Sequence, residues 1–267
     1  CKVDVYVVNG RWRMSANGKF LVTASYDLTY AITPLVPPLE NCAPQHKQLI
    51  SRTQINSLAI SQKGLAAFAT HSAIHLVDLR ARGQKPRCLV GHQMNVCDVA
   101  FFGDQIVSVG EDLTIKTHAT NNQWPLQSIA IDAIPNSVDV IDDLSRILIS
   151  TEKGTLETWN FIEKIKTSQV GISKEPVRST ARSVETLFSG TMDGKVHFSM
   201  LAPEGLVLVN SRDGHEGIVL KTAADPGGSF FVSAGSDSCA KIWDQRSSEA
   251  VRTLSEESQE KWIWDVV

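Results

Sequence analysis

The stretch GSDSCAKIWDQR, from Gly235 to Arg246, contains a tight turn centred on an aspartate and ends in a Trp-Asp strand. Ser233 lies four residues before Asp237, and Trp243 lies six residues after it. The preceding segment DGHEG, at 213–217, supplies a Gly-His pair. A serine, a turn aspartate and a tryptophan at such offsets suggest one unit of a repeat, so further copies of the pattern are expected along the chain.

The pattern recurs at intervals of about forty residues. IVSVGEDLTIKTH carries Ser108, Asp112 and His118 in the same frame, whereas His71 and Lys153 stand at the turn of the second and fourth repeats. The successive turn positions are 27, 71, 112, 153, 193 and 237, with spacings of 44, 41, 41, 40 and 44. The chain therefore contains six recognisable repeats of one structural unit.

Each repeat predicts short β-strands. Runs such as INSLAI, VCDVAFF and IVLKTAA precede the turn region, and alternating strands such as AKIWD follow it. Four short strands in about forty residues are typical of one blade of a β-propeller. With 267 residues, 42% of them hydrophobic, the chain is long enough for one all-β domain spanning 1–267.

Composition and motifs exclude several classes of protein. The net charge of −3 argues against a broadly basic nucleic-acid surface. Five cysteines without a CxxC pair favour neither disulfides nor a zinc site, and they indicate a reducing, cytoplasmic or nuclear location. No apolar run has transmembrane length, and no signal peptide is apparent at the start, where the absence of methionine suggests a fragment. No phosphate-binding, dinucleotide, zinc-protease or nucleophile-elbow motif occurs, so no catalytic residue, cofactor or metal is expected.

The repeats are similar to those of the WD-repeat family. In that family the Gly-His histidine, the strand Ser or Thr, the turn Asp and the Trp form a hydrogen-bonded chain, which satisfies the polar groups of a buried tryptophan. The corresponding residues here are His215, Ser233, Asp237 and Trp243 in the sixth repeat, and His92, Ser108 and Asp112 in the third. No such chain is expected in the fourth repeat, where Lys153 replaces the aspartate.

The two ends of the sequence predict how the propeller closes. KVDVYVV at 2–8 resembles a strand without a hairpin of its own, and WIWDVV at 262–267 resembles the first strand of a further repeat. We expect seven blades, with these two segments as the outer and inner strands of an incomplete seventh blade. A six-bladed ring, with the last strand docked beside the first hairpin, is the alternative.

Large side chains near the turns are candidate binding residues. In WD-repeat propellers the turns that hold the aspartate and the loops leading into each inner strand share one face, and aromatic, Met and Arg side chains dominate interface energetics. The candidates for partner binding are Tyr26, Met94, Glu111, Met192 and Trp262. The alternative for each is local packing within its own blade.

The resemblance implies a non-catalytic scaffold for protein–protein interaction within a larger complex. Segments including LVTASYDLT, VGEDLT and EKWIWDVV are similar to the small propeller subunits of TOR-kinase complexes, which implies a kinase as partner. An RNA-associated propeller of the ribosome-assembly type is the alternative and would require a basic stripe. An enzyme on this fold would require converging acid, base or metal-binding residues, and none can be identified.

Overall fold

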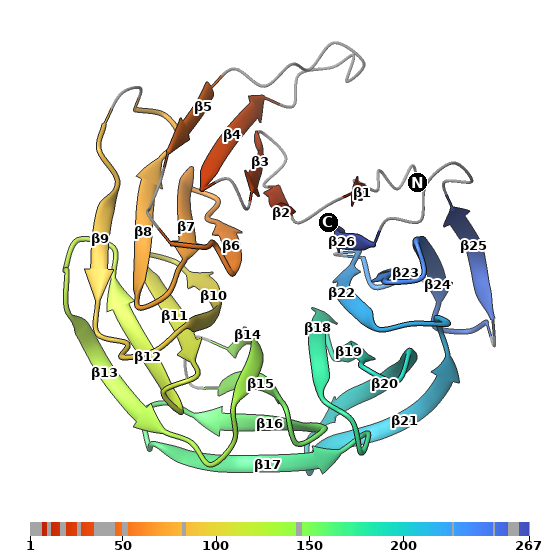
Figure 1. The fold of residues 1–267 in the computed structure, drawn as a ribbon. Helices are drawn as coiled ribbons and strands as arrows, with labels where there is room; N and C mark the ends of the chain where they lie inside the picture. Colours follow the sequence, from red (N-terminus) through yellow and green to blue (C-terminus); the bar gives the residue numbers. More distant parts are fainter. Residues whose placement is uncertain are drawn as a thin grey trace. The chain divides into compact units, whose positions relative to one another are not determined.

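The computed structural model describes residues 7–9, 12–16, 20–25, 28–34, 46–49, 53–81, 84–142, 146–225, 227–247, 249–255 and 262–266. Within these residues every regular element is a β-strand, and the strands form six four-stranded sheets and one two-stranded sheet (Figure 1). The predicted all-β class is therefore confirmed. We number the four-stranded sheets 1 to 6 in chain order, and each corresponds to one sequence repeat.

Each four-stranded sheet is an antiparallel meander of consecutive strands. Sheet 1 contains β2 (Trp12–Ala16), β3 (Phe20–Ser25), β4 (Thr29–Pro34) and β5 (His46–Leu49). Sheet 2 contains β6 (Ser57–Ile60), β7 (Leu65–Ala69), β8 (Ala73–Asp78) and β9 (Arg87–Val90). Sheet 3 contains β10 (Val96–Phe102), β11 (Gln105–Gly110), β12 (Thr114–Ala119) and β13 (Pro125–Ala130).

The later repeats follow the same order. Sheet 4 contains β14 (Pro135–Asp142), β15 (Arg146–Thr151), β16 (Thr155–Asn160) and β17 (Ile165–Gly171). Sheet 5 contains β18 (Val177–Ser183), β19 (Thr186–Thr191), β20 (Lys195–Ala202) and β21 (Gly205–Asp213). Sheet 6 contains β22 (Val219–Ala224), β23 (Phe230–Gly235), β24 (Cys239–Asp244) and β25 (Ala250–Ser255).

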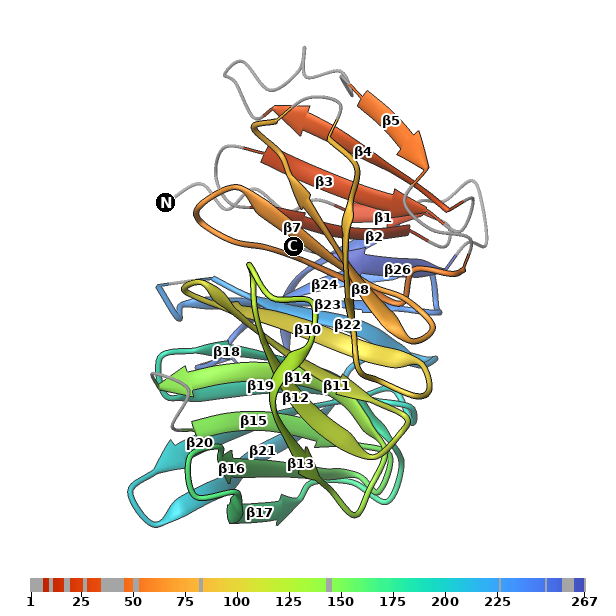
Figure 2. The ribbon, with the colours of Figure 1, turned by 90° about the vertical axis from the view of Figure 1, so that its left-hand side faces the viewer.

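Contacts divide the chain into two compact units. The N-terminal unit holds sheets 1 to 3, and the C-terminal unit holds sheets 4 to 6 together with the two-stranded sheet. Within the N-terminal unit, sheets 2 and 3 lie side by side (Figure 2), and the side-chain amide of Asn56 donates to the backbone oxygen of Val96 across them. The assignment of 1–267 to a single domain stays a prediction.

The two-stranded sheet joins segments from the two ends of the sequence. Strand β1 (Val7–Asn9) pairs antiparallel with β26 (Ile263–Val266), with Val7 opposite Val266. Strand β26 packs on sheet 6, where Ile263 and Val266 are buried with Val232 and Ala234. A partial seventh sheet is therefore confirmed, but its expected outer and inner strands pair directly with each other, so the expected outer and inner arrangement of the two strands is wrong.

The second strand of each sheet carries much of the core. Alternation is lost in β11, β15, β19 and β23, where all but the first residue are buried, a pattern typical of strands that are buried on both faces. In the C-terminal unit, aromatic rings of sheets 5 and 6 pack together. Phe188 lies 5.0 Å from Phe198 and 5.3 Å from Phe231 between ring centroids, with Trp243 beside them.

The turn between the second and third strands has one conformational requirement in most sheets. The residue after the turn position has a positive φ at Leu28, Leu113, Gly154, Gly194 and Ser238. Glycine adopts this left-handed conformation without steric cost, whereas leucine and serine adopt it against their preference. The recurrence of this backbone shape shows that these five turns are structurally equivalent.

Candidate functional site

A buried hydrogen-bonded chain connects the turn of sheet 6 to its core tryptophan. His215 Nδ1 lies 2.8 Å from Asp237 Oδ1, His215 Nε2 lies 2.7 Å from Ser233 Oγ, and Trp243 Nε1 donates to the same hydroxyl at 2.8 Å. Because the Nδ1–H group of His215 donates to the carboxylate, Nε2 accepts from the serine hydroxyl, which in turn accepts from the indole N–H. Asp237 also accepts from the backbone N–H groups of Glu216 and Cys239.

These interactions also act on the charge of Asp237. Burial raises the pKa of this carboxyl, but the hydrogen bonds from His215 and from the two backbone N–H groups more than offset it, so the pKa lies below its ordinary value. The chain stabilises the loop before β22, the turn before β24 and the core of the sheet as one unit.

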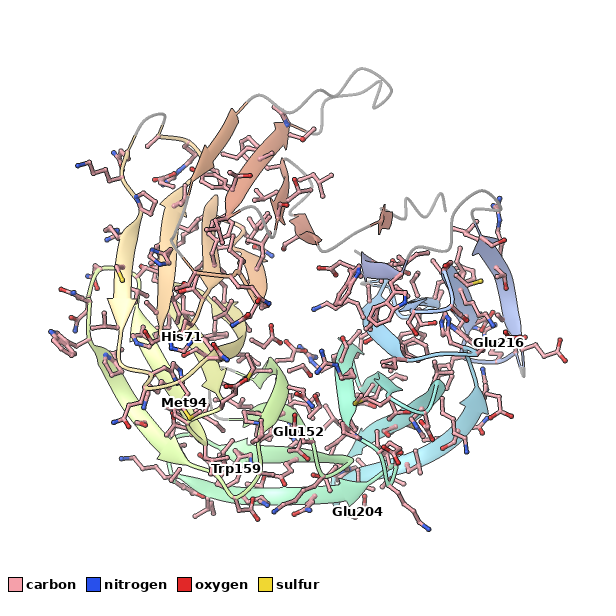
Figure 3. All side chains as sticks on the ribbon, in the orientation of Figure 1. His71, Met94, Glu152, Trp159, Glu204 and Glu216 are labelled. Atoms are coloured by element: carbon pink, nitrogen blue, oxygen red, sulfur yellow. The ribbon has the colours of Figure 1, made fainter. Side chains whose placement is uncertain are left out.

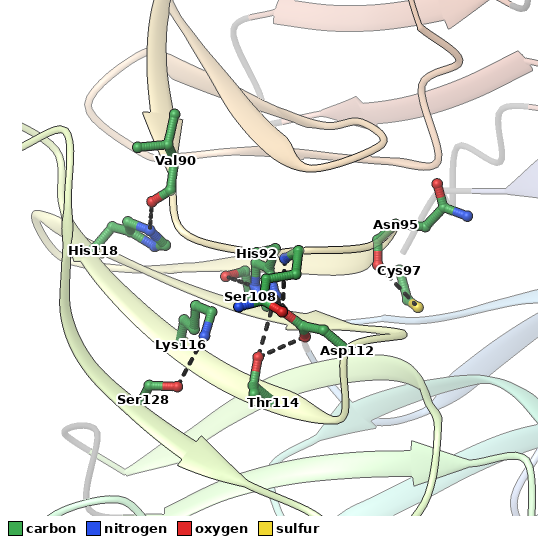
Figure 4. Close-up of polar contacts among 11 residues, drawn as sticks. Val90, His92, Asn95, Cys97, Ser108, Asp112, Thr114, Lys116, His118 and Ser128 are labelled. Atoms are coloured by element: carbon green, nitrogen blue, oxygen red, sulfur yellow. Dashed lines mark hydrogen bonds and ion pairs between the residues drawn. The ribbon is translucent and has the colours of Figure 1, made fainter.

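Sheet 3 repeats this chain up to the tryptophan position (Figure 4). His92 Nδ1 lies 2.9 Å from Asp112 Oδ1, His92 Nε2 lies 2.9 Å from Ser108 Oγ, and Thr114 Oγ1 donates to Asp112 at 2.6 Å. His118 takes the place of tryptophan, and its Nε2 donates instead to the backbone oxygen of Val90 at 3.1 Å. Its Nδ1 is buried without a hydrogen-bond partner among the described residues, and burial lowers the pKa of His118 to about 4.

Sheet 4 lacks the His–Ser–Asp chain, as expected from Lys153, and a glutamate accepts from its tryptophan instead. Glu157, on β16, is fully buried, and its Oε2 accepts the indole N–H of Trp159 at 3.0 Å. Its Oε1 accepts from Lys166 Nζ at 3.0 Å, and the ammonium also lies 5.4 Å from the centre of the Trp159 ring. Lys166 lies on the outer strand β17 with its side chain 23% exposed, and its ammonium reaches inward to the buried carboxylate.

Sheet 5 uses a different histidine. His197, on β20, is buried, with Nδ1 2.8 Å from Ser211 Oγ and Nε2 3.2 Å from Thr191 Oγ1. Thr191 Oγ1 donates to Asp193 Oδ1 at 2.5 Å, so the turn aspartate is still linked to the interior. Burial lowers the pKa of His197, which keeps the ring neutral.

Two positions before the turn position, the sheets with a His–Asp pair carry glycine and sheets 4 and 5, which lack the pair, carry threonine. At Gly110 an added Cβ would lie 2.7 Å from His92 Nδ1 and 2.9 Å from Asp112 Oδ1, and at Gly235 it would lie closer still to the equivalent atoms. Sheets 4 and 5 lack the histidine and carry Thr151 and Thr191 at this position. Glycine therefore makes room for the His–Asp pair, and a threonine hydroxyl occupies the space where the pair is missing.

In the N-terminal unit, the candidate binding residues lie on a surface fixed by hydrogen bonds. Asn95 connects two turns, since its Oδ1 lies 2.7 Å from His71 Nδ1 and its Nδ2 donates to Glu111 Oε2 at 2.9 Å. Beside it, the side chain of Met94 is 49% exposed. Figure 3 labels His71, in the turn of sheet 2, and Met94, in the loop before sheet 3. Leu113, which the sequence analysis did not single out, is 39% exposed next to the same turn.

The C-terminal unit carries two further candidates. Met192 is 39% exposed in the turn of sheet 5, and its backbone N–H donates to the oxygen of Pro176. Trp262 is 45% exposed directly before β26, and its ring centroid lies 5.2 Å from that of Trp264. Tyr26 lies outside the described residues. A role of these side chains in binding stays a prediction.

The described residues offer neither a metal site nor a membrane-spanning helix. They contain no group of three or more His, Cys, Asp or Glu side chains placed to hold a metal ion. They also contain no helix with the length and apolar character needed to cross a membrane.

Comparisons with known proteins agree with this geometry. The family profile described as WD domain, G-beta repeat, matches residues 206–244, the segment that contains the complete chain of sheet 6. Among curated proteins, human WD repeat-containing protein 36 is 28% identical over 105 residues, which are 39% of this chain and 12% of that protein. The match thus spans only a small part of that relative.

Among solved structures, the WD40 β-propeller domain of Doa1 superimposes with a TM-score of 0.78 at 20% identity, over 94% of this chain and 83% of that one. At this identity the likeness concerns the fold alone. The chain thus has the WD40 β-propeller fold, with a WD repeat at 206–244.

Proposed function

We propose that the chain is a non-catalytic scaffold, a subunit of a larger multiprotein complex of the TOR-kinase type. Proteins with the WD40 propeller fold generally serve as platforms for protein–protein interaction, and this general role is the starting point. The TOR-kinase type is supported by the resemblance of LVTASYDLT, VGEDLT and EKWIWDVV to propeller subunits of those complexes.

The observation that carries the proposed role is the presentation of Met94. About half of this large apolar side chain faces solvent, although the backbone on both sides of it is held in place. The N–H of Gln93 donates to Asp112, and the side chain of Asn95 contacts both His71 and Glu111. Burying an apolar side chain on a partner is favourable, and little backbone entropy is lost when the loop is already ordered. An exposed methionine on a rigid loop is therefore suited to act as a binding anchor.

Trp262 is the corresponding candidate in the C-terminal unit. A tryptophan at the centre of an interface can contribute about 2 kcal/mol or more, on the order of thirtyfold in affinity. Because β26 pairs with β1, Trp262 also adjoins a segment needed for folding. The two roles are separable by substitution. Replacing a binding anchor lowers the affinity for the partner at unchanged stability, whereas replacing a core residue lowers the stability first.

The test is affinity capture with the intact chain carrying Met94→Ala or Trp262→Ala, followed by mass spectrometry. The chain offers matched controls in Met200→Ala and Trp124→Ala, which remove exposed side chains of the same types away from the turns that hold the candidates. We expect the two candidate variants to lose partners at unchanged melting temperature, while the controls keep them. Equal recovery by all four variants would refute the proposed surface.

The identity of the captured proteins tests the type of complex. Recovery of a large kinase supports the TOR-kinase type. Recovery of ribosomal or nucleolar proteins in its place would favour the RNA-associated alternative.

A further inference from the structure

The N-terminal unit is electrically polarised along its strands. We call the end formed by the loops 53–56, 91–95 and 131–134 and the turns 70–72 and 111–113 the turn end. Backbone hydrogen bonds join these segments, from Glu111 N to Asn95 O and from Ile131 N to Leu113 O. The charged residues described there are all acidic, namely Glu111, Asp112 and Asp132.

At the other end of the same sheets, positively charged side chains outnumber negatively charged ones among the described residues. Its described turns and strand ends carry four cations and two carboxylates, namely Lys63, Arg80, Lys85 and Arg87 with Asp78 and Asp104. Two of the cations pair locally, Lys63 with Asp104 and Arg80 with Asp78. Lys116 of β12 lies against Gly91 of the turn end, but it is buried and its ammonium donates to Ser128 Oγ. Among the described residues, the acidic character is therefore a property of the turn end and not of the whole unit.

Exposed apolar side chains lie within this negative field. Met94 and Leu113 are both partly exposed at the turn end, and Glu111 between them in sequence is oriented by Asn95. An apolar side chain provides affinity, whereas surrounding charges of one sign determine which partner approaches and in which orientation. A partner with carboxylates would be repelled here, and one with ammonium or guanidinium groups would be attracted.

We propose that the turn end of the N-terminal unit binds a positively charged segment of a partner protein, one that carries Lys or Arg side chains around an apolar residue. The apolar residue contacts Met94 and Leu113, and the cations face Glu111 and Asp132. This inference rests on the proposed interaction role and adds the chemistry of the partner. The charge asymmetry between the two ends of the unit selects this occupant over a neutral or acidic one.

The test uses the intact chain and three labelled synthetic peptides. One peptide is rich in Lys and Arg around a single Leu, one has Glu and Asp in place of the cations, and one keeps the cations but has Ala in place of Leu. Fluorescence anisotropy at low and at physiological salt gives the dissociation constants. We expect the first peptide to bind more tightly than about 1 mM and more tightly than the other two, and to weaken as salt screens the charges.

Charge-removing variants locate the site. Glu111→Gln keeps an oxygen to accept from Asn95, and Asp132→Asn is similarly conservative, so both should fold normally. We expect each to weaken binding of the first peptide by about 1.5-fold to fivefold. Asp104→Asn, at the opposite end, is the matched control and should not weaken it. Equal binding of the acidic peptide, no effect of the two variants, or no binding tighter than about 1 mM would each overturn the inference.

The outcomes separate this inference from the proposed function. If Met94→Ala abolishes partner capture while Glu111→Gln and Asp132→Asn affect neither capture nor peptide binding, the surface is right and the inferred partner chemistry is wrong. If Met94→Ala also leaves capture unchanged, the proposed surface itself is wrong.

Discussion

Replacing Asp237 with alanine tests the hydrogen-bonded chain of sheet 6. The carboxylate accepts from His215 Nδ1, whose side chain is 0% exposed, and from two backbone N–H groups. A buried donor left without an acceptor costs about 1–3 kcal/mol, whereas the two backbone groups lie at the turn and can bind water at smaller cost. We therefore expect Asp237→Ala to lower the free energy of unfolding by about 2 kcal/mol.

The structure provides a matched control in the fourth repeat. Lys153 occupies the equivalent turn position but is exposed, and the polar chain of sheet 4 runs through Glu157. Lys153→Ala should therefore change the free energy of unfolding by less than about 0.5 kcal/mol. Urea unfolding followed by tryptophan fluorescence measures both variants, and unchanged m-values are needed for the comparison. Equal losses in the two variants would show that the chain does not stabilise sheet 6 as argued.

Coupling within the chain gives a second measurement of the same interaction. Ser233→Ala removes the hydroxyl that lies between His215 and Trp243. If the chain acts as one unit, the double variant with Asp237→Ala should lose less than the sum of the single variants, by about 0.5 kcal/mol or more. Strict additivity would mean that the two residues act independently.

Three further predictions follow from the turns, the histidines and the buried ion pair. Gly154→Ala should cost at least about 2 kcal/mol in thermal or urea unfolding, since φ is positive and the new Cβ would lie closer than 3.0 Å to the backbone oxygen of Ser173. Gly171→Ala, with nothing within 4 Å, should stay within about 0.5 kcal/mol. His118 has a pKa of about 4 when folded, below its ordinary 6.5, so its contribution to stability is present above pH 6.5 and is lost as the pH falls toward 4. The free energy of unfolding of His118→Phe should therefore decrease less steeply between pH 6.5 and 4 than that of the wild type, by about 1 kcal/mol per pH unit. Parallel curves of the free energy against pH would contradict this. Glu157→Ala should lower the free energy of unfolding by about 3 kcal/mol or more, because it leaves the indole N–H of Trp159 and the Lys166 ammonium without their acceptor. Glu163→Ala, at an exposed position, is the control. A loss no larger than that of the control would show that water replaces the carboxylate.

The repeat could be predicted from the sequence because its signals are local. The offsets from Ser233 to Asp237 and Trp243 are set by one turn between two strands, so they predict the sheet and the hydrogen bonds within it. The same frame located Asp112 and Ser108 although the tryptophan is missing there. Strand order follows from this periodicity, and the partial seventh sheet was predicted from the strand-like segments at the two ends of the sequence.

Other features could not be predicted because they depend on contacts that the frame does not specify. Glu157 lies at a position where the sixth repeat has Lys241, and only the fold shows that its carboxylate reaches Trp159. The connection of His71 to Glu111 through Asn95 spans two sheets, at separations that no repeat fixes. Exposure at the turn end likewise depends on the left-handed backbone of Leu113.

The different polar chains of sheets 3 to 6 have a consequence for assembly. Their hairpins share one backbone shape, which is the condition under which a strand can be exchanged for its counterpart in another repeat or in a second chain. A hairpin from sheet 4 placed in sheet 6 would separate Glu157 from Lys166, because Ala250 occupies the equivalent position of β25, and it would leave the imidazole of His215 without its carboxylate. Such an exchange buries unsatisfied polar groups, at about 1–3 kcal/mol each, so it is disfavoured. The side-chain chemistry thus makes each hairpin compatible only with its own sheet, although the backbones are nearly alike, and it disfavours strand swapping.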